Sequence, residues 1–195
     1  MKAVFSKVSN RGIPPRSFID ELVEWGKTAP EEIFAPNNDP EDVFNRLKPL
    51  LGPWESPLHR RCAMLELLRC LAGFESSWNW KEGVDTTNAT SMRNIEGRET
   101  GIFQVSFDSL RLDDAQETGD DLHRCVMRYC GALDICKFLD LMKSNHVFAF
   151  EYASRLLRNN YFWDGPIKRH EIDQWLDRDA VNEFKILLDN QPTIQ

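Results

Sequence analysis

The sequence predicts a single α+β domain in which helices predominate and a small β-hairpin interrupts them. Apolar residues recur at intervals of three and four along most of the chain, and proline and capping residues mark where these segments begin. One polar stretch, containing glycine, asparagine and threonine, breaks this pattern near the middle of the chain. The 195 residues are 42% hydrophobic and include 12 Phe and 6 Trp, which is enough apolar surface for a sizeable core.

Composition excludes several functional classes. The 24 Lys and Arg residues against 31 Asp and Glu residues give a net charge of −7, which argues against nucleic acid or an anionic membrane as a partner. We expect a soluble protein without a signal peptide, because apolar runs fall well short of the roughly 20 residues of a bilayer-spanning helix. Five cysteines are too few for a disulfide scaffold, so free, buried thiols are expected.

Residues 1–55 are expected to form a helical extension packed on the rest of the chain. After an irregular arm, apolar residues at helical spacing predict a helix over 17–27. A second, short helix is predicted over 40–48, with Asp39 as its N-cap and Pro40 as its first helical residue. A run that contains proline and glycine then ends this helix.

Residues 56–195 are expected to form the main domain. Ser56 and Pro57 repeat the pattern of a cap followed by proline, and they open the strongest predicted helix, which runs to about residue 74 with one apolar face. The polar stretch over 82–95 is typical of loops or a small hairpin. Further helices are predicted over 122–129, 132–142, 146–159 and 179–188, with a weaker one over 170–176.

Glu75 is the first candidate functional residue. A step of three from Ala72, on the apolar face of the strongest helix, leads to Glu75, so a carboxyl stands where burial is expected. Burial disfavours the ionised form and raises the pKa of a glutamate above about 4.3, which keeps a general acid protonated near neutral pH. The polar and aromatic segment 76–80 that follows is typical of a sugar-binding cleft. The alternative is a glutamate at a helix end that turns out to water.

Two segments resemble motifs of a known family. Segment 71–79 reads Leu-Ala-Gly-Phe-Glu-Ser-Ser-Trp-Asn, and it resembles the Glu-Ser-Ser/Ala-aromatic-Asn motif of soluble lytic transglycosylases and goose-type lysozymes. Segment 101–106 reads Gly-Ile-Phe-Gln-Val-Ser, and it is similar to the Gly-Leu-Met-Gln-hydrophobic motif that lines the cleft in that family. The resemblance covers about 56–165. It implies a lysozyme-like fold, a glycan substrate and a catalytic domain over 56–195, with Glu75 as the catalytic acid.

The same resemblance implies the residues that meet the substrate. Ser77, Trp78 and Gln104 are expected to bind it, with Gln104 contacting N-acetyl or hydroxyl groups. The third family motif, Ala-Tyr-Asn-Ala-Gly, is absent as written, and its nearest counterpart places Tyr161 at the position of the tyrosine that reaches the acid. The alternative for Tyr161 is an ordinary core or surface aromatic. The separation between Glu75 and the second motif is also longer than the family leads us to expect, which predicts an enlarged insert.

A second carboxylate decides the reaction. An inverting hydrolase holds its base about 6.5–9.5 Å from the acid, and a retaining hydrolase holds its nucleophile at about 5–5.5 Å. Asp85, Glu96 and Glu99 are the candidates within the insert, and we favour Glu99 because it stands two residues before Gly101. With such a carboxylate hydrolysis is expected. Without one, the acetamido group of the substrate attacks, as in lytic transglycosylases.

No cofactor or metal is expected. The cysteines and histidines lack the paired Cys-x-x-Cys spacing of a zinc site, and Cys125 and Cys136 are expected to face a core. A glycine-rich phosphate loop is also missing from the sequence.

The sequence therefore predicts an enzyme that cleaves a β-1,4-linked amino-sugar polymer, peptidoglycan first, as a muramidase or lytic transglycosylase. A chitosanase or chitinase of the same superfamily is one alternative, because a negatively charged protein attracts cationic chitosan. A non-catalytic interaction protein that retains the fold is another. We expect a monomer that acts outside the cytoplasm on a polysaccharide. If it is an antibacterial toxin, an inhibitor or immunity protein is a further expected partner.

Overall fold

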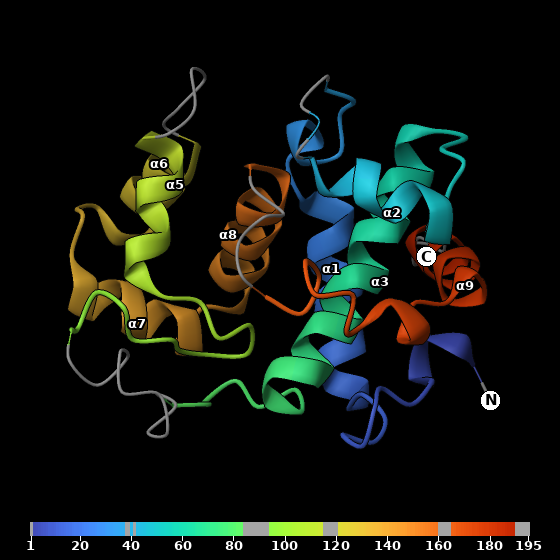
Figure 1. The fold of residues 1–195 in the computed structure, drawn as a ribbon, viewed down its shortest axis with the longest axis horizontal. Coiled ribbons are helices and arrows are strands. Elements are labelled where there is room, and N and C mark those ends of the chain that lie inside the picture. Colours follow the sequence, from blue (N-terminus) through green and yellow to red (C-terminus); the bar gives the residue numbers. More distant parts are fainter. Residues whose placement is uncertain are drawn as a thin grey trace, which may run out of the picture.

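The computed structural model describes residues 2–37, 40, 42–83, 94–114, 121–159 and 165–189, and these are predominantly α-helical, as predicted (Figure 1). The helices are α1 (Arg16–Thr28), α2 (Val43–Leu51), α3 (Pro57–Ser76), α5 (Arg111–Asp114), α6 (Asp121–Cys130), α7 (Ile135–Ser144), α8 (His146–Asn159) and α9 (Arg178–Asp189). Four 3₁₀ turns accompany them, at Ala3–Phe5, Glu31–Ile33, Phe107–Leu110 and Asp173–Trp175.

Extended pairing is nearly absent from the described residues. The predicted hairpin falls on 82–95, of which 84–93 lie outside the described residues. The rest of that stretch contains no strand. One antiparallel bridge, between Thr100 and Val105, is the β structure that the described ranges contain.

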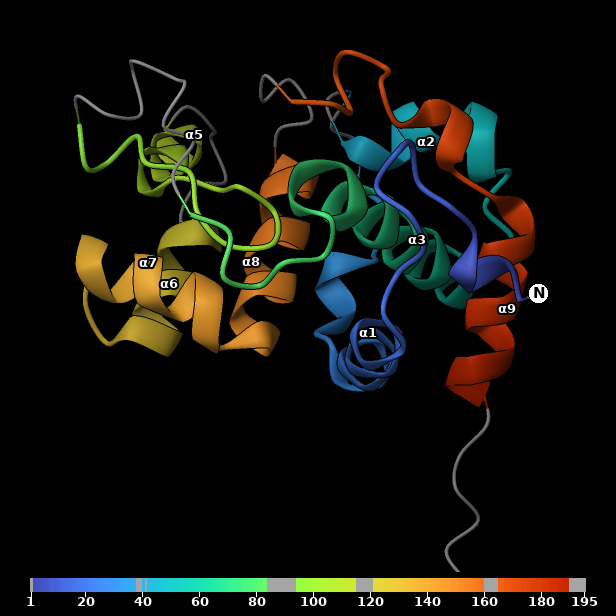
Figure 2. The same cartoon turned by 90° about the horizontal axis from the view of Figure 1, so that it is seen from below.

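Helix α3 is the centre of the fold. As predicted, the Ser56 hydroxyl caps it by accepting a 3.1 Å hydrogen bond from the His59 amide, and Pro57 occupies its first turn. Helices α1, α2, α8 and α9 contact it. In both ribbon views α8 lies between α3 on one side and α5, α6 and α7 on the other (Figures 1 and 2). The expected single apolar face is wrong, because α3 is buried around most of its circumference. Neighbours on several sides leave α3 no solvated stripe.

Buried charges on α3 are paired. The Glu66 and Arg69 side chains are completely buried, and the Arg69 Nε and Nη2 atoms each donate a 2.7 Å hydrogen bond to the Glu66 carboxylate. Arg69 also donates to the carbonyl oxygens of Ser6 (2.9 Å) and Trp175 (3.2 Å). The Glu66 carboxylate accepts a 2.9 Å hydrogen bond from the Asp177 amide. This ion pair therefore fastens both the N-terminal arm and the segment before α9 to the central helix.

The N-terminal helices differ from prediction at one cap. Helix α1 agrees with the predicted 17–27 within one residue at each end. Helix α2 starts and ends three residues later than predicted, because the Asp42 carboxylate accepts a 3.0 Å hydrogen bond from the Phe44 amide and caps it there. The expected cap, Asp39, lies outside the described residues. The run over 49–53 ends α2 as predicted, since the helix includes Pro49 but stops at Leu51, with Gly52 as its C-cap.

The C-terminal helices follow the sequence prediction closely. Helix α8 has the predicted bounds, and α6 and α9 agree within one residue. Helix α7 starts at Ile135 instead of 132, because the Asp134 carboxylate caps it by accepting a 3.0 Å hydrogen bond from the Lys137 amide. The weaker helix predicted over 170–176 is a single 3₁₀ turn, Asp173–Trp175.

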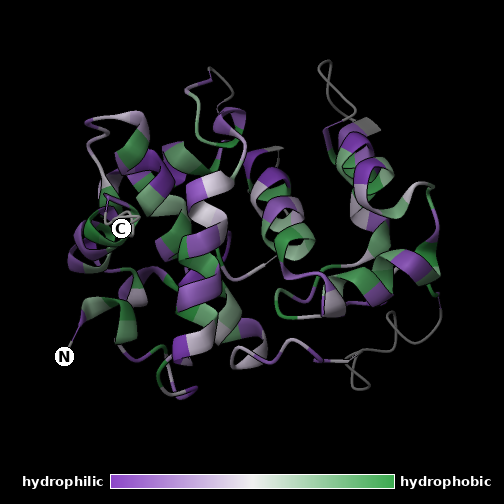
Figure 3. Ribbon diagram, turned by 180° about the vertical axis from the view of Figure 1, so that it is seen from behind, coloured by the Kyte–Doolittle hydropathy of each residue, from purple (hydrophilic) through white to green (hydrophobic). Residues whose placement is uncertain are grey.

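The core joins the two predicted regions. Buried apolar residues of the first 55 positions, such as Val8, Phe18 and Leu22, belong to the same cluster as Leu65 of α3 and Phe184 of α9. Most helices carry both hydrophobic and hydrophilic residues along their length, as helices with one side in a core do (Figure 3). The boundary at residue 55 stays a prediction. None of the described helices combines the length and apolar character that crossing a bilayer requires.

All five cysteines are free thiols. Four of them are buried as expected, whereas Cys136 is exposed. The prediction that Cys136 faces a core is wrong, because it lies on the outer side of α7, whose buried residues are Phe138 and Met142.

Candidate active site

A polar pocket with a volume of about 340 Å³ lies at the C-terminal end of α3. Its walls come from the end of α3, from the chain just after it, from the 99–104 segment and from the N-terminal arm. The lining residues are Arg11, Glu75, Ser76, Ser77, Glu82, Gly83, Glu99 and Gln104. Four of the predicted site residues, Glu75, Ser77, Glu99 and Gln104, thus line one pocket. The structure brings together the two sequence motifs that carry the family resemblance.

The first motif ends α3 in an abrupt turn. The amide of Ser77 donates to the Gly73 carbonyl (3.0 Å), and the amide of Trp78 donates to the Ala72 carbonyl (3.1 Å). Ser77 and Trp78 both adopt the left-handed region, with φ of 55° and 60°. Because such backbone is costly for residues with a Cβ, it persists only where the surroundings enforce it. The turn leaves Ser77 exposed at the pocket and Glu75 half-buried beneath it.

The second motif forms a tight turn beside the first. Thr100 and Val105 exchange backbone hydrogen bonds of 3.1 and 3.2 Å, and the Gly101 amide donates to the Glu82 carbonyl (3.0 Å). Gly101 has a φ of 71°, and a Cβ there would lie 2.6 Å from the Met142 carbonyl oxygen, so only glycine fits. The turn is thereby held against both α7 and the chain that follows α3.

Gln104 is folded back on this turn. Its backbone φ is 47°, and its side-chain Nε2 donates a 2.9 Å hydrogen bond to the Gly101 carbonyl. The side chain is 9% exposed and lines the pocket. A single amide therefore both stabilises the turn and borders the pocket.

The surroundings of Glu75 raise the pKa of its carboxyl group. Burial is the main cause, and the negative charge of Glu99 is the second, and together they raise the pKa of Glu75 to about 7. The Glu171 carboxylate raises it further, whereas the Arg169 and Arg11 guanidinium groups lower it. At neutral pH a large share of Glu75 is consequently protonated and can donate a proton to a bound molecule.

Trp78 does not lie in the pocket, and its expected role in substrate binding is corrected. Its side chain is 5% exposed, and its indole Nε1 donates a 3.1 Å hydrogen bond to the Arg69 carbonyl. The ring lies so close to Gly73 that a Cβ on that glycine would come within 2.5 Å of it. The two left-handed residues after α3 turn this indole back against the helix. Trp78 is therefore a core residue that completes the helix end.

Other predicted residues also fall away from the pocket. Trp80, in the aromatic segment after Glu75, stacks on His146 with ring centroids 3.6 Å apart. Glu96 forms a 2.8 Å ion pair with Arg111 and does not line the pocket. Asp85 and Tyr161 lie outside the described residues.

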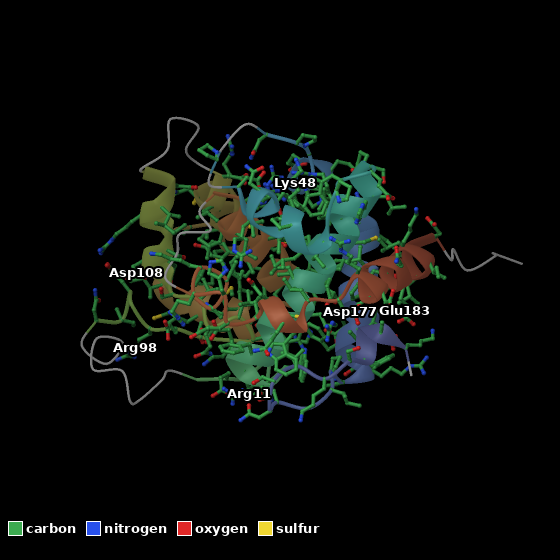
Figure 4. All side chains as sticks on the ribbon, turned by 45° about the vertical axis from the view of Figure 1, so that its right-hand side comes forward. Arg11, Lys48, Arg98, Asp108, Asp177 and Glu183 are labelled. Carbon is green, nitrogen blue, oxygen red and sulfur yellow. The ribbon has the colours of Figure 1, made fainter. Side chains whose placement is uncertain are left out.

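The sequence pattern missed two charged residues of the lining and two charged residues near it. Arg11 and Glu82 line the pocket, and Arg169 and Glu171 act on the pKa of Glu75. Arg11 extends from the N-terminal arm beside the end of α3 (Figure 4). These residues lie in irregular segments, so no periodicity marks them. Their positions follow from the tertiary contacts of the arm and of the segment before α9.

Within the part of the chain that the structure describes, no group of three or more His, Cys, Asp or Glu side chains is arranged to hold a metal ion. Comparisons of this protein with family models, with curated proteins and with solved structures find no match. The fold and the pocket therefore define the class as a helical protein with a half-buried glutamate, its pKa raised to about 7, in an acidic pocket.

Proposed function

We propose that the protein is a glycan-cleaving enzyme that acts on a β-1,4-linked amino-sugar polymer, peptidoglycan first, with Glu75 as its general acid. The observation that carries this proposal is the environment of Glu75. Its carboxyl lines a pocket with Glu99, and its pKa is raised to about 7. Glycosidases use two carboxyl groups, one as the proton donor and the other as a base, a nucleophile or a charged partner.

Each carboxyl has a distinct task in this proposal. Glu75 protonates the glycosidic oxygen as the bond to the leaving sugar breaks, since its proton is held near neutral pH. The Glu99 carboxylate activates a water, attacks the anomeric carbon or stabilises the positive charge that develops on the remaining sugar. If Glu99 activates water or attacks, the product is a reducing sugar. If it does neither, the acetamido group of the substrate attacks the anomeric carbon as the leaving sugar departs. The C6 hydroxyl of the same sugar then displaces the acetamido oxygen and gives its proton to the Glu75 carboxylate, which closes an anhydro ring, and the enzyme is a lytic transglycosylase.

Ser77 and Gln104 are proposed to bind the sugar through hydrogen bonds. Both line the pocket, and their hydroxyl and amide groups suit the hydroxyl and N-acetyl groups of an amino sugar. We also propose a lysozyme-like fold with a small hairpin at the cleft. It is supported by a buried central helix that ends at the acid and by the short Thr100–Val105 turn beside it. As peptidoglycan lies outside the cytoplasm, we propose that the protein acts there.

The test is to incubate the purified protein with peptidoglycan, chitin and chitosan and to identify the released fragments by mass spectrometry. A reducing product and an anhydro product differ by one water. Glu75→Gln is expected to lower the rate on peptidoglycan by about 100-fold or more. Glu96→Gln is the matched control, because this glutamate pairs with Arg111 outside the pocket. No release from any polymer by the parent protein would overturn the proposal.

One observation favours a second candidate. Three of the lining side chains are carboxylates and one is a guanidinium, which favours a cationic polymer such as chitosan. Release from chitosan alone would make the protein a chitosanase. If Glu75→Gln leaves lysis of cell walls unchanged, Glu75 is not the general acid, and if the parent protein releases nothing from any polymer, a non-catalytic interaction protein is the better description.

A further inference from the structure

The N-terminal arm supplies the one cation in the described lining of the pocket. Arg11 is exposed and belongs to this lining, whereas the ionisable residues around it, Glu75, Glu82 and Glu99, are all acidic. The arm lies before the region covered by the two motifs. Through Arg11, the arm therefore reaches the pocket that Glu75 and Glu99 line.

The arm is a fixed part of the fold. Val4 and Val8 are fully buried, and the Ser6 carbonyl accepts a 2.9 Å hydrogen bond from Arg69 of α3. The chain then closes a tight turn. The Arg11 amide donates to the Val8 carbonyl and the Val8 amide donates to the Gly12 carbonyl, both at 3.0 Å. Arg11 therefore projects from an anchored turn, and its side chain alone needs ordering when a ligand binds.

Balancing the charge of Glu75 is a minor part of what Arg11 does. The Arg11 charge lowers the pKa of Glu75 less than the Arg169 charge does, and both are outweighed by burial and Glu99. A guanidinium presents a planar set of donors that binds a carboxylate through two parallel hydrogen bonds. Neutral or cationic sugars offer no such acceptor, and a cationic amine next to Arg11 would be repelled.

We propose that Arg11 is a specificity-determining residue that binds a carboxylate carried by the sugar chain, so that the pocket selects an acidic amino-sugar polymer over a neutral or cationic one. This inference rests on the proposed function and narrows its substrate. The three carboxyl groups of the lining favour a cationic ligand, whereas Arg11 favours an anionic one, so the experiment measures which of them sets the preference.

The experiment compares two forms of one substrate. Soluble peptidoglycan strands with free carboxylates are compared with the same strands after amidation of their carboxylates. The ratio of kcat/KM on the acidic strands to kcat/KM on the amidated strands is measured for the parent, Arg11→Gln, Arg11→Lys and Arg16→Gln. Arg16 is the matched control, because it is an exposed arginine that follows the same arm, pairs with Asp20 and does not line this pocket.

We expect Arg11→Gln to lower this ratio about tenfold, because the charge-assisted, bidentate hydrogen bonding between the guanidinium and the substrate carboxylate is lost. Arg11→Lys keeps the charge without the bidentate geometry and should lower the ratio less. Arg16→Gln should leave the ratio unchanged. An unchanged ratio in Arg11→Gln would overturn the inference and leave the proposed function intact. An equal loss of kcat/KM on both strand forms, together with a shifted pH profile, is one such result. If the parent cleaves neither strand form and no other glycan, the proposed function itself fails.

Discussion

The Ser76 hydroxyl lies 2.8 Å from the carbonyl oxygen of Ile102, and this contact joins the last turn of α3 to the turn that carries Gln104. Both groups are buried, and the hydroxyl also lies 3.0 Å from the Ala72 carbonyl of its own helix. Ser76 and Ile102 are 26 residues apart in the chain, and this hydrogen bond joins the two motifs to which they belong. The packing of these two turns against each other therefore depends in part on this hydrogen bond.

Replacing Ser76 tests that dependence. We expect Ser76→Ala to lower the free energy of unfolding by about 1–3 kcal/mol, because the buried Ile102 carbonyl loses its partner. Ser144→Ala is the control, since the Ser144 hydroxyl is exposed and bonds only to the Asp140 carbonyl of its own helix (2.8 Å). It should change stability by less than about 0.5 kcal/mol. Equal effects of the two variants in denaturant unfolding would show that the hydrogen bond between Ser76 and Ile102 does not contribute to the free energy of unfolding.

The pH profile of activity should report the proton on Glu75. Its pKa is raised to about 7, so kcat/KM is expected to fall as the pH rises through about 7 and the acid loses its proton. Because the charge of Glu99 is a cause of this raised value, Glu99→Gln should move the alkaline fall to lower pH. If Glu99 is also the base, this variant loses activity as well, and a carboxyl NMR titration of Glu75 then supplies the pKa. A titration of Glu75 that is the same in both proteins would contradict the coupling.

The same raised pKa predicts that Glu75 costs stability above neutral pH. The folded protein holds this proton up to a pH of about 7, whereas an unfolded chain releases it near 4.5, so stability falls as the pH rises between these values. Glu75→Gln should remove that loss and stabilise the protein at pH 8 by up to about 3 kcal/mol, with little change at pH 4. Thermal unfolding at both pH values measures this. A Tm difference that does not depend on pH would indicate that the carboxyl is not desolvated.

Local signals predicted the helices well wherever the chain marks its own boundaries. Ser56 and Pro57 start α3 as expected, because a capping hydroxyl followed by proline acts within one turn. The start of α2 could not be chosen from the sequence alone. Asp39 and Asp42 both suit a cap, and the second is held in place by a 3.0 Å hydrogen bond from Arg158 of α8, more than 100 residues away.

In the candidate site, too, residues carried by short motifs could be predicted, whereas residues placed by tertiary contacts could not. Glu75 and Gln104 could be predicted because short motifs carry them, and the raised pKa follows from placing a carboxyl at the end of a buried helix. Trp78 was misplaced because its orientation depends on two consecutive left-handed residues, a conformation that neither composition nor spacing reveals. Arg11 was missed because tertiary contacts place its arm, such as the one between Ser6 and Arg69 of α3 and the one between Val4 and Glu183 of α9.

Gly101 tests whether the second motif needs glycine for its backbone or for its space. Gly101→Ala is expected to destabilise the protein both by the left-handed φ of 71° and by a Cβ 2.6 Å from the Met142 carbonyl oxygen. Gly131→Ala is the matched control, since its φ is 73° and nothing lies within 4 Å of the added Cβ. The control should cost about 1–2 kcal/mol, and Gly101→Ala about 1–3 kcal/mol more. Equal losses in denaturant unfolding would mean that the turn does not press against α7.

The ion pair of Glu66 and Arg69 provides the last prediction, because it holds the arm and the segment before α9 on α3. Both side chains are completely buried, so Arg69→Met leaves an unpaired carboxylate in the core and should cost about 3–5 kcal/mol. The double variant Glu66→Leu with Arg69→Met removes both charges and should recover part of this loss, although the contacts to Ser6, Trp175 and Asp177 stay missing.

An exposed pair of the same spacing is the control. Glu24 and Lys27 lie three residues apart on α1 with 2.7 Å between their charged atoms, and Lys27→Met should change stability by less than about 1 kcal/mol. Denaturant unfolding of the four proteins measures the difference. If Arg69→Met costs no more than Lys27→Met, the buried pair does not hold the two segments. If it costs more, and the Arg11 dependence of substrate choice is lost as well, the pair also positions the arm at the pocket.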